Sequence, residues 1–135
     1  MLRLLNGDNM EKILITGASR GIGKFLSEHY SKLGRQIYGT YNPSSPQIDN
    51  VGDSDGCLTP IYRQVDVRDE QKVLEWIESV NPDKDDHLIL INCAGVNYNC
   101  VMHKSDSEKW IEVFSINLYG VYYAIKHIIP CMRLS

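Results

Sequence analysis

The segment from Thr16 to Gly23 constrains the fold of this 135-residue chain more than any other. It reads Thr-Gly-Ala-Ser-Arg-Gly-Ile-Gly, follows the apolar, β-branched run 13–16, and opens an amphipathic stretch over 22–33. A chain that turns from a buried strand into a helix beside a ligand needs residues that adopt positive φ and carry no Cβ. The N-terminus of such a helix presents free N–H groups and a positive dipole end to a phosphate. In this strand–loop–helix context, the glycines predict a dinucleotide-binding site rather than a merely glycine-rich turn.

Strands and helices alternate along the rest of the chain. We predict strands over residues 13–16, 36–41, 61–67 and 87–91, and helices over residues 22–33, 69–80 and 105–129. Strands that are apolar along their whole length are typical of a parallel sheet covered on both faces. Segment 42–57 is rich in Pro, Gly, Ser and Asp, so the crossover through it is not expected to form a full helix. The pattern predicts one α/β unit with no domain linker.

Apolar stripes on two of these helices predict their buried faces. On helix 22–33 the stripe consists of Ile22, Phe25, Leu26, Tyr30 and Leu33. On helix 105–129, at about 100° per residue, it consists of Trp110, Val113, Phe114, Val121, Ala124, Ile125 and Ile128. Asn117 falls in the middle of the second stripe, so it is expected to be buried. Ser105 and Glu108 predict a capping box at the start of this helix.

The composition excludes several classes of protein. With 43% hydrophobic and 23% charged residues, residues 1–135 fit one globular domain rather than a disordered or collagen-like chain. The 14 Lys and Arg against 17 Asp and Glu give a net charge of −3, so no basic field is available for nucleic acid or an anionic membrane surface. No apolar run approaches the roughly 18 residues of a membrane helix.

The N-terminus and the cysteines indicate the compartment. Residues 1–9 lack a signal-peptide core, and we expect them to be a loose leader before a functional start at Met10. The cysteines are Cys57, Cys93, Cys100 and Cys131. They include no Cys-x-x-Cys pair, and no closely spaced pair of histidines joins them. They are therefore interpreted as reduced thiols of a cytoplasmic protein, not as metal ligands.

Four motifs occur in the order and spacing of the short-chain dehydrogenase/reductases. The loop Thr16–Gly23 has the spacing G-x-x-x-G-x-G, Asp66-Val67 follows the third strand, and Asn92-Cys-Ala-Gly95 follows the fourth. Trp110…Asn117-Leu-x-Gly120…Pro130-x-Met132 is similar to the family helix that carries the active-site Asn. Over residues 10–132 the chain resembles this family, and among its subfamilies the β-ketoacyl carrier-protein reductase type. The resemblance implies a Rossmann-like, doubly wound parallel sheet of strand order 3-2-1-4, ending before a fifth strand.

The resemblance also implies which residues contact a nicotinamide dinucleotide, with Asp66 and Val67 against the adenine. The expected cofactor-binding residues are Gly17, Ser19, Arg20, Gly21, Ile22, Gly23, Thr40, Asp66, Val67, Asn92, Ala94 and Gly95. Cys93 replaces the second Asn of the family motif, and this weakens a hydrogen bond expected to support the fourth strand.

The end of the second predicted strand favours NADP over NAD. NAD sites place an Asp or Glu there to hold the ribose 2′-hydroxyl, whereas a 2′-phosphate needs a nearby cation. Here the strand ends Gly39-Thr-Tyr-Asn42 with no acid, and Arg20 projects from the glycine loop. The resemblance implies this role for Arg20 and Thr40; the alternative for Arg20 is a plain surface arginine. NADP(H) is therefore the expected cofactor, ahead of NAD(H).

Asn117 is the catalytic candidate. A buried amide must be hydrogen-bonded or it costs roughly 1–3 kcal/mol. Asn117 is either a satisfied core amide or, as the resemblance implies, a residue that helps hold the active-site water and lysine. Tyr122-x-x-x-Lys126 fits the family's catalytic Tyr-x-x-x-Lys, but it follows Asn117 on the same helix, off the core stripe, with no serine-bearing strand before it. We interpret it as a chance match.

The family's catalytic Ser, Tyr and Lys follow the position of Met132 and have no counterpart in this sequence. Two functions stay open. One is an NADP-dependent reductase that transfers hydride to a carbonyl and takes its second half from another chain or a longer product. The other is a cofactor-binding module or residual fragment without turnover. Strand 88–91 would then have an exposed apolar edge, and helix 105–129 apolar residues outside its stripe, so self-association is expected.

Overall fold

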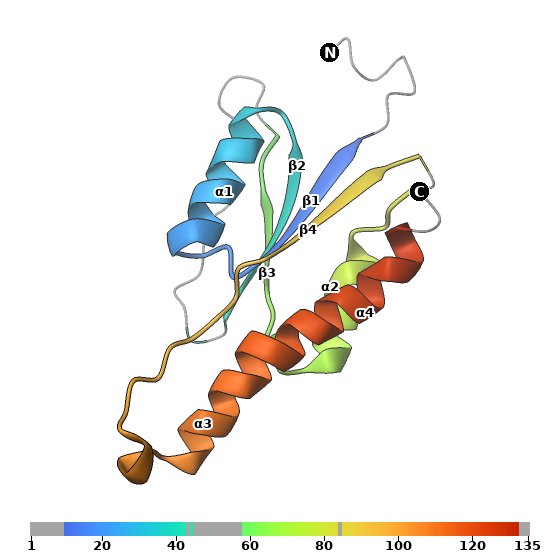
Figure 1. Cartoon of the computed structure of the whole chain (residues 1–135). Helices are drawn as coiled ribbons and strands as arrows, with labels where there is room; N and C mark the ends of the chain where they lie inside the picture. The colour runs from blue at the N-terminus through green and yellow to red at the C-terminus, as the bar shows by residue number, and fades with distance from the viewer. Residues whose placement is uncertain (1–9, 43, 45–57, 84, 133–135) are drawn as a thin grey trace.

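The computed structural model describes residues 10–42, 44, 58–83 and 85–132, so the expected leader 1–9 and most of segment 42–57, including Cys57, lie outside the described residues. The elements are β1 (Glu11–Thr16), α1 (Gly21–Lys32), β2 (Gln36–Tyr41), β3 (Ile61–Gln64), α2 (Glu70–Ser79), β4 (His87–Asn92), a 3₁₀ turn η2 (Met102–Lys104), α3 (Ser107–Phe114), a π-helical turn η3 (Ser115–Tyr119) and α4 (Gly120–Met132) (Figure 1). The predicted alternation of strands and helices is confirmed.

The four strands form one parallel sheet in the order β3-β2-β1-β4, as predicted. Helix α1 covers one face, and α2 with the continuous helix α3–η3–α4 covers the other (Figure 1). Along β1, Ile13 and Ile15 belong to the core under α1, whereas Leu14 belongs to the core under α2 and α4. The uniformly apolar strand therefore supplies both cores.

Strand β3 is shorter than predicted, because it ends at Gln64 and not at Val67. The reason lies in its neighbour: β2 ends at Tyr41, which is in register with Gln64. The N–H of Val65 still donates to the carbonyl of Tyr41 at 2.9 Å, and beyond that point the described residues contain no strand that continues the ladder.

The buried face predicted for helix α1 is confirmed only in part, because Leu26 and Tyr30 pack against the core but Leu33 is exposed. The buried residues of α1 are Gly23, Ser27 and Ser31, while Ile22 and Phe25 are 73% and 64% exposed. Small side chains let the helix approach the sheet closely, and both serines satisfy their hydroxyls there. Ser27 shares a 2.6 Å hydrogen bond with the Tyr62 hydroxyl, and Ser31 donates to the carbonyl of Leu58.

The long helix differs from prediction at its start and in its buried face. Its N-cap is Asp106, whose carboxylate accepts from the backbone of Glu108 and Lys109, so the predicted capping box at Ser105 is wrong. The residues that it buries are Ile116, Gly120, Ala124 and Ile128. The π turn η3 closes hydrogen bonds to the fifth residue, so it rotates the residues after it relative to a uniform α-helix. Of the predicted stripe, Ala124 and Ile128 are buried as expected, Val113 and Val121 are half-buried, and Trp110, Phe114 and Ile125 are exposed.

Candidate functional site

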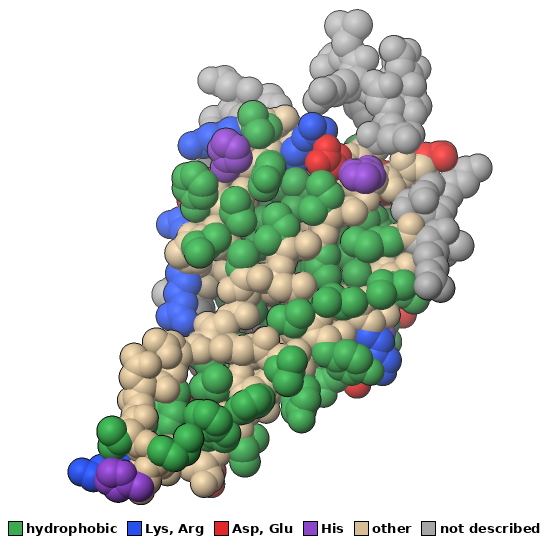
Figure 2. All heavy atoms as spheres, viewed as in Figure 1, with side chains coloured by type: hydrophobic (Ala, Val, Ile, Leu, Met, Phe, Trp, Pro, Cys, Tyr) green, Lys and Arg blue, Asp and Glu red, His purple; other side chains and the backbone are tan. Residues whose placement is uncertain are grey.

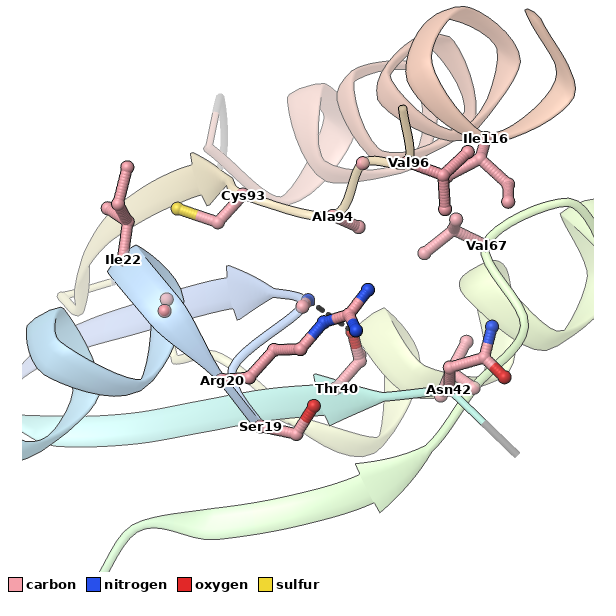
Figure 3. Close-up of a pocket in the computed structure, with 15 residues that line it drawn as sticks. Ser19, Arg20, Ile22, Thr40, Asn42, Val67, Cys93, Ala94, Val96 and Ile116 are labelled. Atoms are coloured by element: carbon pink, nitrogen blue, oxygen red, sulfur yellow. Dashed lines mark hydrogen bonds between the residues drawn. The ribbon is translucent and has the colours of Figure 1, made fainter. Parts of the chain in front are cut away.

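A pocket of about 330 Å³ opens at the carboxyl ends of β1, β2 and β4, where ligands bind in parallel α/β sheets (Figure 3). The predicted residues that line it are Gly17, Ser19, Arg20, Gly21, Ile22, Gly23, Thr40, Val67, Ala94 and Gly95. Three predicted residues, Asp66, Asn92 and Asn117, are not among its lining residues. The pocket also includes residues that were not among the predicted cofactor contacts, namely Asn42, Val65, Cys93, Val96 and Ile116.

Each glycine of the loop is required by its own geometry. Gly17 has φ +68°, and a Cβ there would lie 2.7 Å from Cα of Ala94. Gly23 has no room either, since its Cβ would lie 2.2 Å from the carbonyl oxygen of Gly17. Gly21 has φ +55° with open space around the position of a Cβ. Gly17 and Gly23 thus let the loop pack closely against the end of β4 and the start of α1, and the open space beside Gly21 belongs to the pocket.

Two threonine hydroxyls fix the backbone around the pocket, Thr40 at the glycine loop and Thr16 at the segment after β4. The hydroxyl oxygen of Thr40, which is 1% exposed, accepts from the N–H of Gly17 at 3.1 Å, and its carbonyl accepts from Ala18 at 2.7 Å. The hydroxyl oxygen of Thr16 accepts from the N–H groups of Cys93 and Ala94 at 3.1 and 3.2 Å. Thr40 therefore fixes the loop as well as lining the pocket.

The start of α1 fits an anionic group. Its N-cap residue, Arg20, makes no side-chain capping bond, and the first turn contains no acid. The first N–H groups of a helix have no partner within the helix, and they favour negative charge. Figure 3 shows the Arg20 and Thr40 side chains projecting into the pocket. Glycines without room for a Cβ, an uncapped helix start and a cation together fit the pyrophosphate of a dinucleotide.

Asn117 supports the opposite wall of the pocket. Its Oδ1 accepts from the N–H of Val96 and its Nδ2 donates to the carbonyl of Val96, both at 2.8 Å. Asn117 is exposed, so its predicted burial is wrong; it lies in the π turn, which moves it out of the buried face. Its amide is satisfied, and it fixes the backbone beside Gly95, whose Cβ would lie 3.4 Å from Oδ1.

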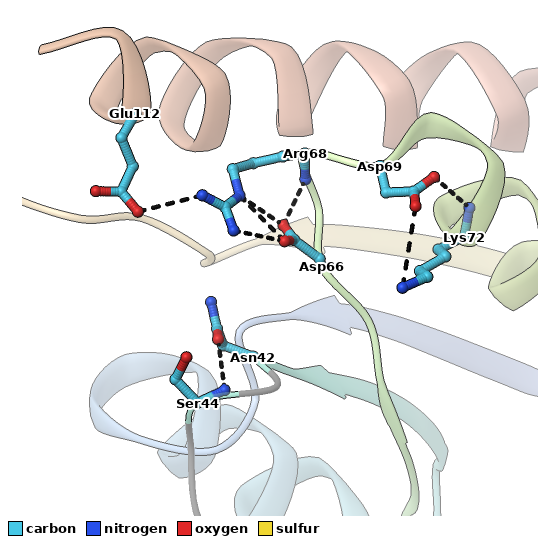
Figure 4. Close-up of polar contacts among 7 residues, drawn as sticks. All are labelled: Asn42, Ser44, Asp66, Arg68, Asp69, Lys72 and Glu112. Carbon is cyan, nitrogen blue, oxygen red and sulfur yellow. Dashed lines mark hydrogen bonds and ion pairs between the residues drawn. The ribbon is translucent and has the colours of Figure 1, made fainter. Parts of the chain in front are cut away.

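An ion-pair bridge runs beside the pocket from the loop after β3 to α3 (Figure 4). The carboxylate of Asp66 accepts from the backbone N, Nε and Nη2 of Arg68 at 3.0, 2.9 and 2.6 Å. Nη1 of Arg68 donates to Glu112 at 3.2 Å. The hydrogen bond from Arg68, opposed by partial burial, lowers the pKa of Asp66. Sequence reasoning missed Arg68 and Glu112, because residues 44 positions apart show no local pattern.

Asn92 and Cys93 end β4 beside the loop. Oδ1 of Asn92 is buried with no hydrogen-bond partner among the described residues. Cys93 lines the pocket where the family motif has Asn, and burial raises the pKa of its thiol.

The Tyr122 and Lys126 pair lies away from the pocket, which neither residue lines. Nζ of Lys126 donates to Glu70 on α2 at 2.6 Å, and it lies 5.8 Å from the centre of the Tyr122 ring. Lys126 therefore joins α4 to α2.

Two features are absent from the described ranges. No helix in them has the length and apolarity needed to cross a membrane. No three His, Cys, Asp or Glu residues within those same ranges gather in a way that could hold a metal ion.

Comparison with known proteins gives the family. A family model described as short chain dehydrogenase matches residues 11–135. The 3-oxoacyl-[acyl-carrier-protein] reductase FabG of Buchnera aphidicola subsp. Schizaphis graminum is 31% identical over 121 residues, which are 88% of this chain and 48% of that protein. Acetoacetyl-CoA reductase of Rhizobium meliloti is 31% identical over 109 residues, 81% of this chain and 44% of that protein. The chain thus spans about half the length of these relatives.

Solved structures share the fold. The ligand-free aldohexose dehydrogenase of Thermoplasma acidophilum superposes with a TM-score of 0.73 at 26% identity, covering 94% of this chain and 46% of that one. A short chain dehydrogenase of Leptospira borgpetersenii with bound NAD+ gives 0.73 at 26% identity, covering 92% and 46%. These comparisons and the 3-2-1-4 sheet with its glycine loop agree with the resemblance found in the sequence. The chain belongs to the short-chain dehydrogenase family.

Proposed function

We propose that this chain binds NADP(H) in the pocket at the start of α1, as the cofactor-binding half of a short-chain reductase. The observation that carries this proposal is the loop Gly17–Gly23, which lines a pocket of about 330 Å³ beside an uncapped helix start. Bound NADP(H) supplies hydride exchange between its nicotinamide and a carbonyl or alcohol. The chain's own residues bind and orient the cofactor. The remaining predicted contacts, Asn92 and Asp66 among them, are proposed as neighbours of the ribose and the base.

The choice of NADP over NAD rests on charge at the end of β2. The strand ends at Tyr41 and is followed by Asn42, which lines the pocket as an amide and not as a carboxylate. Arg20 is exposed at the rim and forms no ion pair among the described residues. The guanidinium of Arg20 could pair with a 2′-phosphate, and no carboxylate at the end of β2 would repel that phosphate.

The test compares NADPH and NADH binding to the wild-type chain and to Arg20→Gln by fluorescence titration. We expect the wild-type chain to prefer NADPH, and the variant to lose about 10- to 100-fold in NADPH affinity with little change for NADH. Lys24→Gln is the matched control, because Lys24 lies one turn further along α1 in an exposed pair with Glu28. Equal losses in both variants, or a wild-type preference for NADH, would contradict the choice of NADP.

Turnover is a separate proposal. The chain spans about half of its curated relatives, and Asn117 supports the pocket wall through Val96, but no Tyr-x-x-x-Lys pair among the described residues lines the pocket. We propose that reduction of a carbonyl needs a second half from a longer product or another chain. The alternative is an NADP-binding module with no turnover of its own. An NADPH oxidation assay with acetoacetyl-CoA, chosen because one relative is named for it, should show no activity for this chain alone.

Self-association is proposed through apolar surface on the long helix and β4. Exposed side chains there include Trp110, Ile111, Phe114, Leu118 and Tyr122. Figure 2 shows hydrophobic side chains gathered on this side of the molecule. Within the described chain β4 pairs with β1 alone, so its second edge is open. Light scattering after gel filtration should find more than the monomer mass, and a clean monomer would contradict this.

A cytoplasmic location is proposed from the thiols. Cys93, Cys100 and Cys131 form no disulfide within the part of the chain that the structure describes, as is typical of a reducing compartment. Cell fractionation tests this.

A further inference from the structure

The bridge from Asp66 through Arg68 to Glu112 is a network of polar contacts outside the glycine loop. It joins the turn after β3 to α3 through the fork of one guanidinium (Figure 4). Arg68 is 41% exposed and Asp66 20% exposed at their side chains. A planar guanidinium hydrogen-bonds a carboxylate with two parallel donors, and this fixes the orientation of the carboxylate as well as its charge.

The bridge leaves Asp66 with acceptor capacity. An ionised carboxylate has about four lone-pair sites. Oδ1 receives the backbone N and Nε of Arg68, while Oδ2 receives Nη2 at 2.6 Å and shares Nε at 3.1 Å. Oδ2 can therefore accept from one more donor while Arg68 stays in place.

Packing ties the same turn to the long helix at a second point. Val67 lines the pocket and packs on Gly120, where a Cβ would lie 2.9 Å from Cγ2 of Val67. Glu112 and Gly120 lie on either side of the π turn that carries Asn117. The turn 66–68 is thus held against α3 and α4 by an ion pair and by a close contact.

We infer that Arg68 is a positioning residue for the base of the bound nucleotide: it holds Asp66 so that its free acceptor site can take the 6-amino group of adenine. Glu112 orients Arg68 from α3, so recognition of the base depends on the placement of the long helix. This inference rests on the proposed function, because it places the adenine beside Asp66.

The test uses two ligands that differ at one group, NADPH and its hypoxanthine analogue. The analogue carries a carbonyl where adenine carries the 6-amino donor. The proteins are the wild-type chain, Arg68→Gln, Arg68→Lys, Glu112→Gln and the control Lys72→Gln. Lys72 is an exposed cation near Asp66 whose nearest carboxylate contact, to Asp69, is 4.0 Å long. The ratio of the two dissociation constants is the readout, since a partly unfolded variant loses both affinities equally.

We expect the wild-type chain and Lys72→Gln to prefer NADPH by about tenfold. Arg68→Gln should lose the preference, and Arg68→Lys should not restore it, because an ammonium cannot bond Asp66 with two parallel donors and reach Glu112. Glu112→Gln should reduce it about two- to threefold. A wild-type chain that binds NADPH but does not discriminate, or an Arg68→Gln chain with an unchanged or larger ratio, overturns the inference. Absence of NADPH binding by the wild-type chain instead overturns the proposed function.

Discussion

At the residue scale, two glycines of the loop are required for different reasons. Gly17 needs both a positive φ and the absence of a Cβ, because the backbone of Ala94 lies 2.7 Å from where that atom would be. Gly21 needs only the positive φ, and the space around it belongs to the pocket. Substitutions at these two positions should therefore act differently.

We expect Gly21→Ala to lower the free energy of unfolding by about 1–2 kcal/mol, the cost of a left-handed backbone with a side chain. Gly17→Ala should lower it by about 3 kcal/mol or more, because the contact with Ala94 adds to that cost. Gly17→Ala should also break the hydrogen bond from the N–H of Gly17 to the hydroxyl oxygen of Thr40. Urea denaturation measures both. Similar losses for the two variants would show that the crowding at Gly17 is relieved by small movements.

At the scale of elements, a nearly buried ion pair ties the start of β1 to the loop before β4. Nζ of Lys12 lies 2.6 Å from Oδ2 of Asp86, with side-chain exposures of 11% and 9%. Lys12→Met leaves the Asp86 carboxylate buried without its partner, so we expect a loss of about 3–5 kcal/mol in the free energy of unfolding. Lys24→Met, in the exposed pair with Glu28, should cost less than about 0.5 kcal/mol. If Lys12→Met and Lys24→Met lower the midpoint of thermal denaturation equally, burial does not make the Lys12–Asp86 pair more important for stability than the exposed pair.

The ion pair of Lys12 and Asp86 makes the free energy of unfolding depend on pH. Burial alone would raise the pKa of Asp86, but hydrogen bonds from Lys12 and from the backbone of Asp83 outweigh it, so the pKa is lowered. A carboxyl with a lower pKa in the folded state stabilises above its unfolded pKa and loses that contribution as pH falls through the folded value. We expect the wild-type chain to lose stability below about pH 4, and Asp86→Asn to start less stable with a shallower acid slope. An unchanged slope would assign the acid loss to other carboxylates.

The elements also show what could be predicted from the sequence. Strand order, the glycine loop and the position of each helix follow from local pattern and family resemblance. The buried face of the long helix could be predicted only in part: Ala124 and Ile128 are buried as expected, but Asn117 lies in the π turn at Ser115–Tyr119, which breaks the assumed rotation per residue, and is exposed. The bridge of Arg68 could not be predicted either, since Glu112 meets it only in the folded chain.

At the scale of the whole molecule, the described residues form a parallel sheet in which the second edge of β4 is unpaired, and we propose that this sheet binds the cofactor. The chain spans about half the length of its curated relatives, and its α1 and long helix expose apolar side chains such as Phe25 and Ile111. Exposed apolar surface of this kind marks sites of association. If Leu118 and Tyr122 contribute to association as proposed, Leu118→Lys with Tyr122→Lys should lower the mass found by light scattering. NADPH affinity should be unchanged, because neither residue lines the pocket.

We propose that this half of the fold binds NADP(H) on its own. Isothermal titration calorimetry of the 135-residue chain with NADPH tests it most directly, with NADH titrated in parallel under the same buffer. We predict saturable binding of one NADPH per chain and weaker binding of NADH. If the folded chain gives no heat of binding with NADPH, or binds NADH more tightly, then this half of the fold is not an NADP(H)-binding unit.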